Sequence, residues 1–558
     1  MNPPPVTMRV LEEKKYDYTI RKLALERYEK IPDKRVIIIQ IDGLSYNALV
    51  HCMEKGYCRF MRSLVRDKGY HLNKYNVGIP STTPSVQASI MYGDNSSIPG
   101  FRFVDKKKKK QYSCGNPLTV QALEELLFSK HPGIVDGGSS YCNQFSGGAT
   151  RSILTMSTIT KTKRLHRIKE TTLWAFLLLN PVSLIRVLHY TFAEFFLEVF
   201  ESVYYKLKAT FDNKHAHFGL SFPLRRVFVG AIFQELITIG TIIDIKRSVP
   251  RIYVNFNGYD DLTHKRGPKT RSVYIALRAI DRRIKRIYER TKGRYEFNIL
   301  SDHGQVDSVP FRKIEGMEID EYLRMATQVE AEAFASMHEG RLSLTREAFN
   351  KATDAVQTLS APLRCAATGF MHWFSHLSKQ ERKDFIWDNK EKIFVETSSC
   401  LAHMYFNITT KTMNLSEIKK RYPDLIFNLL RSKAIGLVIG REGKDIHVLH
   451  RDGSLVIGRG VKRTGLNFLK TYGDEDLLIK QFKYFLSIKN CGDLILFGDY
   501  DGLRAVSFAE HYGTHGSAGG DMCEAFFLSK GKYNIEKSLN ANVINKIIMN
   551  ASRGSTDR

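Results

Sequence analysis

Two apolar runs that each end in acidic residues constrain the fold of this chain more than any other feature. The run VIIIQID covers residues 36–42, and YEFNILSDHG covers residues 295–304. Continuous apolar, β-branched runs of this length are typical of strands buried on both faces. Open α/β sheets place ligands at the carboxyl ends of their strands. We therefore expect Asp42, Asp302 and His303 to lie at a ligand-binding edge.

Five further segments have the pattern of strands. The run RIYVNF (251–256) is followed by GYDDLTH, and four more runs lie in the last third of the chain, at 401–408, 434–443, 445–454 and 493–502. Between the strands the pattern is helical, as in the basic amphipathic segment 274–291. The chain thus predicts an α/β protein with a large buried core.

The segment GIPSTTPSVQASIMYG (78–93) carries a candidate nucleophile. Pro84 favours a helix that starts at or just after it, because proline suits the first helical turn. Thr82 would then lie at the mouth of a helix N-terminus, where free N–H groups favour an anion. An ordinary N-cap is the alternative, since threonine is a common cap.

Composition limits the partners and the compartment. Lys plus Arg exceed Asp plus Glu by 84 to 58, a net charge of +26, which favours anionic partners such as phosphate esters, nucleic acid or an anionic membrane. We find no nucleic-acid-binding module. Eight cysteines without a C-x-x-C pair indicate a reducing compartment, and the N-terminus lacks the apolar core of a signal peptide. We expect a cytoplasmic protein, with contact to the membrane periphery as an open alternative.

The longest apolar stretch, at residues 172–208, does not have the pattern of a transmembrane helix. Pro181 interrupts it, and Arg186, His189, Glu194 and Glu198 recur through it. From Val182 onward it predicts a long helix with a wide apolar face. That face either packs on the main domain or a partner chain, which we favour, or lies in a membrane interface.

The lysine run at 106–110 is expected to be a solvated loop, with a positive rim near the site as the alternative.

We expect a single catalytic domain that is interrupted twice by inserted segments. The expected segments are a lead-in (1–30), catalytic parts (31–160, 248–315 and 393–540), an apolar helical insertion (161–247), a helical insertion or cap (316–392) and a tail (541–558).

Acids and histidines follow several of these strands and form a candidate metal site. Asp260 and His264 are separated by four residues in GYDDLTH, and His515 lies in the glycine-rich segment GTHGSAGGDM. Carboxylate oxygen and imidazole nitrogen suit Zn²⁺ or another first-row divalent ion. Each residue alone has an ordinary structural explanation, but together they make a metal site the better interpretation.

The order of these motifs resembles the alkaline phosphatase superfamily, and most closely its type I phosphodiesterase/nucleotide pyrophosphatase branch. The strand ending in Asp, then T-x-P, D-x-x-x-H, S-D-H-G and G-x-H-G follow one another between about residues 35 and 530. YVNFNGYDDLTHKRGP and AEHYGTHGSAGGDM resemble a bacterial subgroup described only as alkaline phosphatase family proteins. The middle insertions match loosely.

The resemblance implies a mainly parallel central sheet flanked by helices, with helical insertions, and two divalent metal ions. Zn²⁺ is expected, with Mn²⁺ or Fe as alternatives. One ion would be held by Asp260, His264 and His515, and the other by Asp42, Asp302 and His303. Thr82, two residues before Pro84, would be the nucleophile that forms a phospho-threonine.

The sequence does not identify which residues contact the substrate phosphate. SIPGFRFVD (97–105) lacks the Asn that follows the nucleophile region in several relatives. Thr83 and Arg102 are candidates for that contact.

The expected activity is metal-dependent hydrolysis of phosphate diester or pyrophosphate bonds in a small molecule or a lipid headgroup. Three alternatives remain open: a membrane-associated phosphotransferase that moves a headgroup, a phosphomonoesterase, and an inactive anion-binding relative. The absence of C-x-P-x-R near residue 82 argues against a formylglycine sulfatase.

Overall fold

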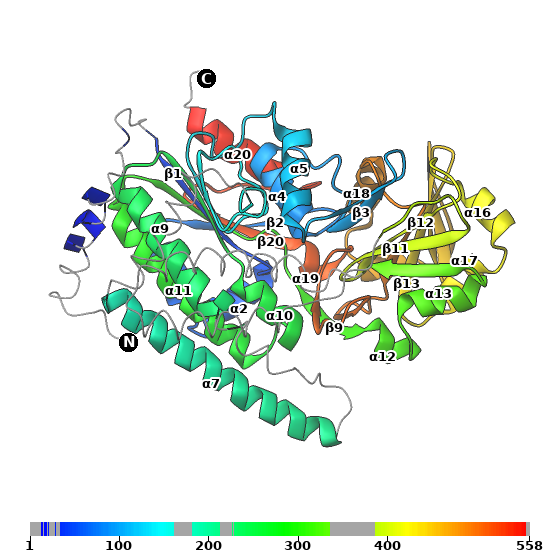
Figure 1. Ribbon diagram of the computed structural model, residues 1–558, viewed down its shortest axis with the longest axis horizontal. Helices are drawn as coiled ribbons and strands as arrows, with labels where there is room; N and C mark the ends of the chain where they lie inside the picture. The colour runs from blue at the N-terminus through cyan, green and yellow to red at the C-terminus, as the bar shows by residue number, and fades with distance from the viewer. Residues whose placement is uncertain are drawn as a thin grey trace.

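Two β-sheets with helices packed around them form the body of the protein (Figure 1). The computed structural model describes residues 34–160, 181–211, 228–334 and 385–553, together with residue 226 and a few residues between 13 and 28. The expected lead-in, the apolar stretch before Pro181 and most of the expected cap at 316–392 lie largely outside the described residues.

The first sheet has seven strands in the order β2-β20-β8-β1-β7-β5-β6. Strands β8, β1, β7, β5 and β6 run parallel, and β20 is antiparallel to both of its neighbours. The expected mainly parallel sheet is confirmed. Its strands are β1 (Val36–Ile41), β2 (His71–Asn76), β5 (Ser139–Tyr141), β6 (Arg151–Ile153), β7 (Arg251–Phe256), β8 (Glu296–Leu300) and β20 (Glu524–Ser529).

Helices cover both faces of this sheet, as its buried strands require. Figure 1 shows α4, α5 and α20 on one side and α9 and α11 on the other. The first group comprises α4 (Thr83–Tyr92), α5 (Pro117–Phe128) and α20 (Asn542–Arg553). The second group and its neighbours are α2 (Tyr46–Glu54), α3 (Arg59–Asp67), α7 (Pro181–Phe211), the π-helix η1 (Phe228–Phe233), α9 (Gln234–Lys246), α10 (Gly258–Arg266) and α11 (Arg271–Thr291).

Strands from the C-terminal part of the chain form a second sheet of eight strands, which the sequence pattern does not predict. Its order is β10-β11-β12-β17-β13-β14-β15-β16, and all its pairs except β10 with β11 are antiparallel. The strands are β10 (Glu330–Phe334), β11 (Lys392–Ser398), β12 (Leu401–Phe406), β13 (Ile435–Glu442), β14 (Asp445–His450), β15 (Gly453–Ile457), β16 (Val461–Gly465) and β17 (Leu494–Gly498).

Smaller elements complete the fold. A three-stranded sheet in the order β18-β9-β19 lies between the two larger sheets, and β3 pairs with β4 in a hairpin. These strands are β3 (Arg102–Asp105), β4 (Lys110–Ser113), β9 (Val306–Pro310), β18 (Arg504–Ser507) and β19 (Gly513–Thr514). The remaining helices are α12 (Phe311–Glu315), α13 (Ile319–Thr327), α16 (Leu415–Arg421), α17 (Leu425–Arg431), the short 3-10 helix η2 (Phe468–Thr471), α18 (Glu475–Ser487) and α19 (Gly520–Cys523).

The lysine run occupies the tip of the β3–β4 hairpin, but its first member is not solvated. Lys106 is buried, and its Nζ lies 2.7 and 2.9 Å from the two carboxylate oxygens of Asp493. The other four lysines are exposed, as expected of a loop. Lys106 therefore anchors the hairpin to the start of β17 in the second sheet, because Asp493 directly precedes that strand.

Candidate metal centre and active site

Sheet order explains why residues from distant parts of the chain meet at one place. Strands β8, β1 and β7 are neighbours and run parallel, so their carboxyl ends share one edge. Asp42 follows β1, Asp302 and His303 follow β8, and α10 follows β7. These are the strand ends where open α/β sheets bind ligands.

Helix α10 and strand β19 complete the group. Asp260 and His264 lie four residues apart on α10, so both side chains lie on one face of the helix. His515 directly follows β19 (Gly513–Thr514), which pairs with β9 next to the end of β8. Gly43 has φ = +75°, and a Cβ at this position would lie 2.7 Å from Asp260 Oδ1. The glycine therefore lets Asp260 approach the end of β1.

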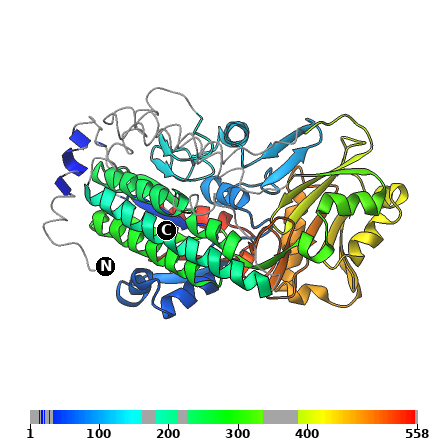
Figure 2. The ribbon, with the colours of Figure 1, turned by 60° about the horizontal axis from the view of Figure 1, so that its bottom comes forward.

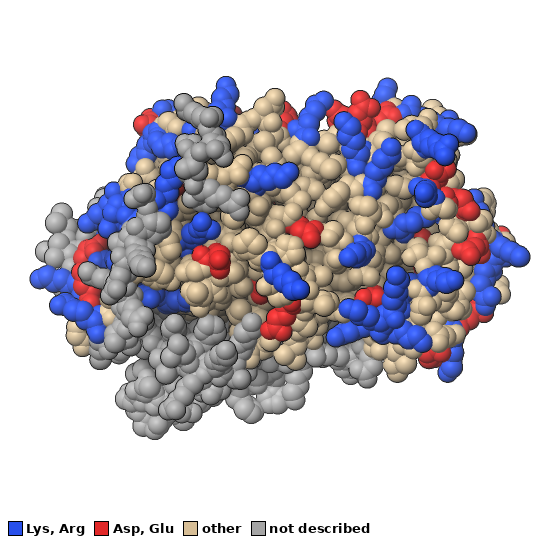
Figure 3. All heavy atoms as spheres, turned by 90° about the horizontal axis from the view of Figure 1, so that it is seen from above, with Lys and Arg blue, Asp and Glu red and all other residues tan. Residues whose placement is uncertain are grey.

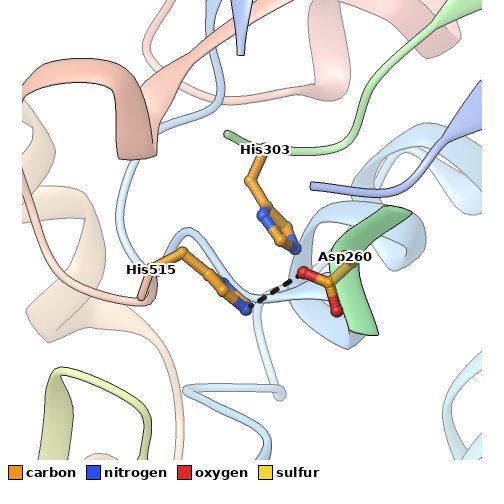
Figure 4. A group of neighbouring side chains, drawn as sticks. All are labelled: Asp260, His303 and His515. Carbon is orange, nitrogen blue, oxygen red and sulfur yellow. Dashed lines mark ion pairs between the residues drawn. The ribbon is translucent and has the colours of Figure 1, made fainter. Parts of the chain in front are cut away.

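Two overlapping groups of side chains have ligand atoms within 4.8 Å of one another. They are Asp260 with His303 and His515, and Asp42 with Asp302 and His303. Figure 4 shows the side chains of the first group converging, with His515 Nε2 3.8 Å from Asp260 Oδ1. His264 Nε2 lies 3.4 Å from the same oxygen and 3.2 Å from His515 Nε2. The structure thus brings together all six residues predicted as metal ligands.

Backbone carbonyls fix the orientation of all three imidazoles. The Nδ1 atoms of His264, His303 and His515 lie 2.8, 3.1 and 2.7 Å from the carbonyl oxygens of Gly513, Gly304 and Ser81. A carbonyl only accepts, so each Nδ1 carries the proton. Each Nε2 is then left with a lone pair that is directed into the group, which is the usual arrangement around metal-binding histidines.

The carboxylates are also held by neighbours. The amide of Asn255 on β7 donates to Asp42 Oδ2 at 3.2 Å, and the backbone N–H of Gly43 donates to Asp302 Oδ1 at 3.2 Å. Gln305 Nε2 donates to Asp260 Oδ1. The first two contacts leave the other oxygen of Asp42 and of Asp302 directed at His303, whose Nε2 lies 3.6 Å from Asp42 Oδ1 and 3.5 Å from Asp302 Oδ2. In Asp260 the same Oδ1 accepts from Gln305 and faces His264 and His515.

The electrostatics of the group favour a bound cation. Asp42, Asp260 and Asp302 are all nearly inaccessible to solvent. Burial, with Asp260 adding to it, raises the pKa of Asp302 to about 7. Burial lowers the pKa of His303 and lowers that of His515 well below its ordinary value, so both imidazoles are neutral at pH 7. Three buried acids beside neutral imidazoles fit divalent cations, whose charge removes the repulsion between the carboxylates.

The two adjacent threonines are placed differently. Thr83 is the first residue of α4, and its Oγ1 lies 3.1 Å from His303 Nε2 and 3.5 Å from Asp42 Oδ1. Thr82 has the backbone conformation of the N-cap, but its side chain makes no capping hydrogen bond. Its Oγ1 is buried and has no hydrogen-bond partner among the described residues. Of the two hydroxyls, that of Thr83 is therefore the one with a hydrogen-bond contact to the candidate ligands.

A cavity of about 110 Å³ opens beside this group. Both threonines line it, together with Asp42, Asp260, His264 and His515, whereas Arg102 is buried on β3 and does not line it. Its apolar wall comes from Phe101, Leu154 and Met156. Sequence reasoning missed the polar lining residues Asn143, Gln144, Asn257, Ser398, Ser399 and His511.

Two of the missed residues lie close in sequence to motifs that were recognised. Asn257 immediately precedes GYDDLTH, and His511 lies four residues before His515. The ring of His511 lies 4.1 Å from that of His264, measured between centroids, and its Nδ1 is 3.3 Å from Ser399 Oγ. Burial and the neighbouring His264 lower the pKa of His511 well below its ordinary value. Ser398 and Ser399 carry no such signal, because they lie at the end of β11 and in the turn after it, far from the recognised motifs in the sequence.

Three solved structures illustrate what the chain is similar to, each at low sequence identity. The phosphonoacetate hydrolase of Sinorhizobium meliloti 1021 in complex with phosphonoformate is 12% identical, with a TM-score of 0.43 and coverage of 93% of this chain and 96% of that one. An inactive variant of murine ectonucleotide pyrophosphatase/phosphodiesterase 5 in complex with AMP is 9% identical, with a TM-score of 0.41 and coverage of 93% and 95%. The alkaline phosphatase PafA is 13% identical, with a TM-score of 0.44 and coverage of 91% and 94%.

The sequence itself matches a known family over most of its length. No curated protein matches the chain at a significant level. The profile of the family "Type I phosphodiesterase / nucleotide pyrophosphatase" matches residues 36–396, which is more than half of the chain and contains five of the six candidate ligands. The chain therefore belongs to the type I phosphodiesterase/nucleotide pyrophosphatase family and is a phosphoric ester hydrolase.

Proposed function

We propose that the protein hydrolyses phosphate diester or pyrophosphate bonds through a phospho-threonine formed on Thr83. The observation that carries this proposal is the position of Thr83 Oγ1, 3.1 Å from His303 Nε2 within the group of candidate ligands. The pattern of residues assigned the role to Thr82, which stands two residues before Pro84. A hydroxyl nucleophile needs an activating group within reach, and of the two threonines only Thr83 has its hydroxyl within hydrogen-bond distance of the described ligand residues.

The residues present fit two divalent cations. Asp260, His264 and His515 would hold one, and Asp42, Asp302 and His303 would hold the other, with Zn²⁺ best matched by this mixture of nitrogen and oxygen ligands. When bound, such ions lower the pKa of a nearby hydroxyl and neutralise the negative charge of a phosphoryl group.

Within that setting the chain positions the reacting groups. Thr83 Oγ attacks phosphorus, the bond from phosphorus to the leaving oxygen breaks, and the hydroxyl proton is finally taken up by the leaving alcohol or by solvent. Water then cleaves the phospho-threonine and restores the hydroxyl. The N–H groups of the first turn of α4 lack partners within the helix and favour negative charge beside Thr83.

The cavity wall supports a substrate with an organic arm. Phe101, Leu154 and Met156 offer an apolar surface, and Asn257, directly before α10, lines the cavity and would offer its amide to the phosphate oxygens. An amide donor from Asn257 would fill the role for which Arg102 was a candidate. A diester or pyrophosphate substrate uses both kinds of wall, because one substituent remains attached to phosphorus during attack.

Paired substrates test this proposal. The metal-stripped protein and the protein loaded with Zn²⁺ or Mn²⁺ would be offered bis(p-nitrophenyl) phosphate and p-nitrophenyl phosphate. We expect metal-dependent cleavage with preference for the diester. Preference for the monoester would identify a phosphomonoesterase. Phosphoryl transfer to an added alcohol in excess of hydrolysis would identify a phosphotransferase.

A further inference from the structure

The long helix α7 exposes its apolar face to solvent, whereas a surface helix usually buries that face. Its outward positions carry large apolar side chains that are 45% to 71% exposed, among them Ile185, Leu188, Phe192, Phe196, Phe200 and Tyr204. A helix on a protein surface normally buries its apolar face and exposes its charges. Figure 2 shows α7 at the front of the helical layer, so this apolar side is presented on the outside of the described structure.

Buried ion pairs fix α7 in this orientation. Glu194 and Glu198 are buried on its inner side, where Arg226 lies 2.7 Å from Glu194 and 2.6 Å from Glu198. Arg266, at the end of α10, also pairs with Glu198. Turning the helix to bury its aromatic side would take these acids away from their arginines, which is costly for buried charges. The apolar face is therefore held outward.

Charge around α7 matches an anionic surface. The neighbouring helix α11 contacts α7 through Arg283, whose guanidinium lies 4.4 Å from the ring centre of Tyr190, and it exposes Arg271, Arg278 and Lys285. Lys and Arg also outnumber Asp and Glu in the whole chain, and they are spread over the face that points away from α7, which Figure 3 shows from above. Two copies of a protein with this net positive charge repel each other, whereas an anionic lipid surface attracts it and its acyl boundary accepts the aromatic side chains of α7.

We propose that the outward face of α7 docks this protein on an anionic lipid bilayer, with the helix lying in the plane of the headgroups. Aromatic and aliphatic side chains on one face, with cations beside them, are the features that hold helices in this position. No helix among the described residues is long and apolar enough to cross a bilayer. This inference does not depend on the chemistry of the metal site.

Vesicle sedimentation of the full chain tests the proposal. The vesicles would be pure phosphatidylcholine or phosphatidylcholine with about 30% phosphatidylglycerol, the latter giving a negative surface potential. The variant Phe192→Ser/Phe196→Ser/Phe200→Ser removes a stripe of three exposed rings. The matched control Leu118→Ser/Phe427→Ser/Leu503→Ser removes three side chains of similar exposure on other elements.

We expect wild type and control to sediment with the anionic vesicles and to be released by high salt. The partition coefficient of the α7 variant onto anionic vesicles should fall by a factor of about ten or more, because the variant loses the apolar area that enters the lipid. Unchanged urea midpoints would show that it is folded. If it does not fold, Ile185→Ser/Leu188→Ser serves instead.

Three results would overturn the proposal. The first is that wild type does not bind either kind of vesicle. The second is that the α7 variant binds as well as wild type. The third is a dimer that the α7 variant disperses while wild type ignores the vesicles, which would make a second copy the occupant of this face.

Discussion

Alanine at Gly43 should weaken metal binding in addition to its cost in folding. Gly43 has φ = +75°, a region that costs alanine about 1–2 kcal/mol. A Cβ there would also lie 2.7 Å from Asp260 Oδ1 and 2.9 Å from Asp260 Cβ, closer than real side chains approach. Helix α10 holds the backbone of Asp260 in place. Its carboxylate therefore has to move by a few tenths of an ångström to make room for the added Cβ.

Metal ligands tolerate displacements of only about 0.2 Å from their ideal distances. Disturbing the contacts that orient a ligand lowers metal affinity by about 10- to 100-fold. We therefore expect Gly43→Ala to lose that factor in Zn²⁺ affinity, with a loss of only about 1–2 kcal/mol in the unfolding free energy of the metal-free protein.

Gly316→Ala is the matched control, because Gly316 has φ = +78° and no described atom lies within 4 Å of the added Cβ. This variant should lose the same unfolding free energy, because the backbone conformation is the same, and it should keep the wild-type Zn²⁺ affinity. Competition with a chromophoric chelator measures the affinity, and urea unfolding measures the stability. Wild-type Zn²⁺ affinity in Gly43→Ala, or an equal loss in both variants, would refute the placement of Asp260 in the metal site.

Three further predictions concern buried charges. Asp281 accepts hydrogen bonds from the N–H groups of Phe60 and Met61 at 2.9 Å, and burial raises its pKa to about 6. The unfolded value is about 3.9, so the native state binds the extra proton, and urea unfolding should show about 3 kcal/mol of stability lost as pH rises from about 4 to above 6. In Asp281→Asn this contribution should vanish, and an unchanged pH slope would contradict the assignment. Glu198→Gln should cost about 3–5 kcal/mol in unfolding free energy, because it removes a charge from a buried cluster of ion pairs; the exposed control Glu289→Gln should cost under about 1 kcal/mol. Lys106→Met should cost a similar 3–5 kcal/mol by leaving Asp493 buried without its cation, and a loss below about 1 kcal/mol in urea unfolding would show that the hairpin anchor is unimportant.

The strands that carry the site were predictable because their sequence pattern is strong. Buried parallel strands need continuous apolar residues, and 36–41, 251–256 and 296–300 have them. The six candidate ligands followed from the residues that end these strands and from the G-x-H-G segment. The structure brings these residues together as that pattern requires.

The second sheet was not predictable from the same signal. Segments 401–406, 435–442 and 494–498 are as apolar as the strands of the first sheet. An apolar run indicates a buried strand but does not identify its neighbours, because pairing depends on contacts between distant parts of the chain. The sequence therefore assigned these strands to the catalytic domain without indicating a separate sheet.

The residue pattern alone does not decide between the two threonines. Counting residues before Pro84 locates the start of α4 but does not fix the direction of a side chain. Thr82 is extended, at φ −113° and ψ 141°, whereas Thr83 has entered the helix. One step along the chain at this change of conformation turns the hydroxyl towards His303.

The helix α7 shows the limit of periodicity. The residue pattern predicts a wide apolar face and favours packing of that face on the domain or on a partner chain. The packing that the structure describes uses the opposite side, where Glu194 and Glu198 meet Arg226. Residue 226 lies outside the helix, so no pattern within α7 could reveal its partner.

Comparison of Thr82→Ala with Thr83→Ala tests the central claim most directly. Both variants would be loaded with Zn²⁺ and assayed on bis(p-nitrophenyl) phosphate, with metal content measured in parallel. We expect Thr83→Ala to retain its metal and to lose diester cleavage by a factor of about 10³ or more, because the nucleophile is gone, while Thr82→Ala keeps most of its activity. Loss of cleavage in Thr82→Ala with near-normal turnover in Thr83→Ala would contradict it.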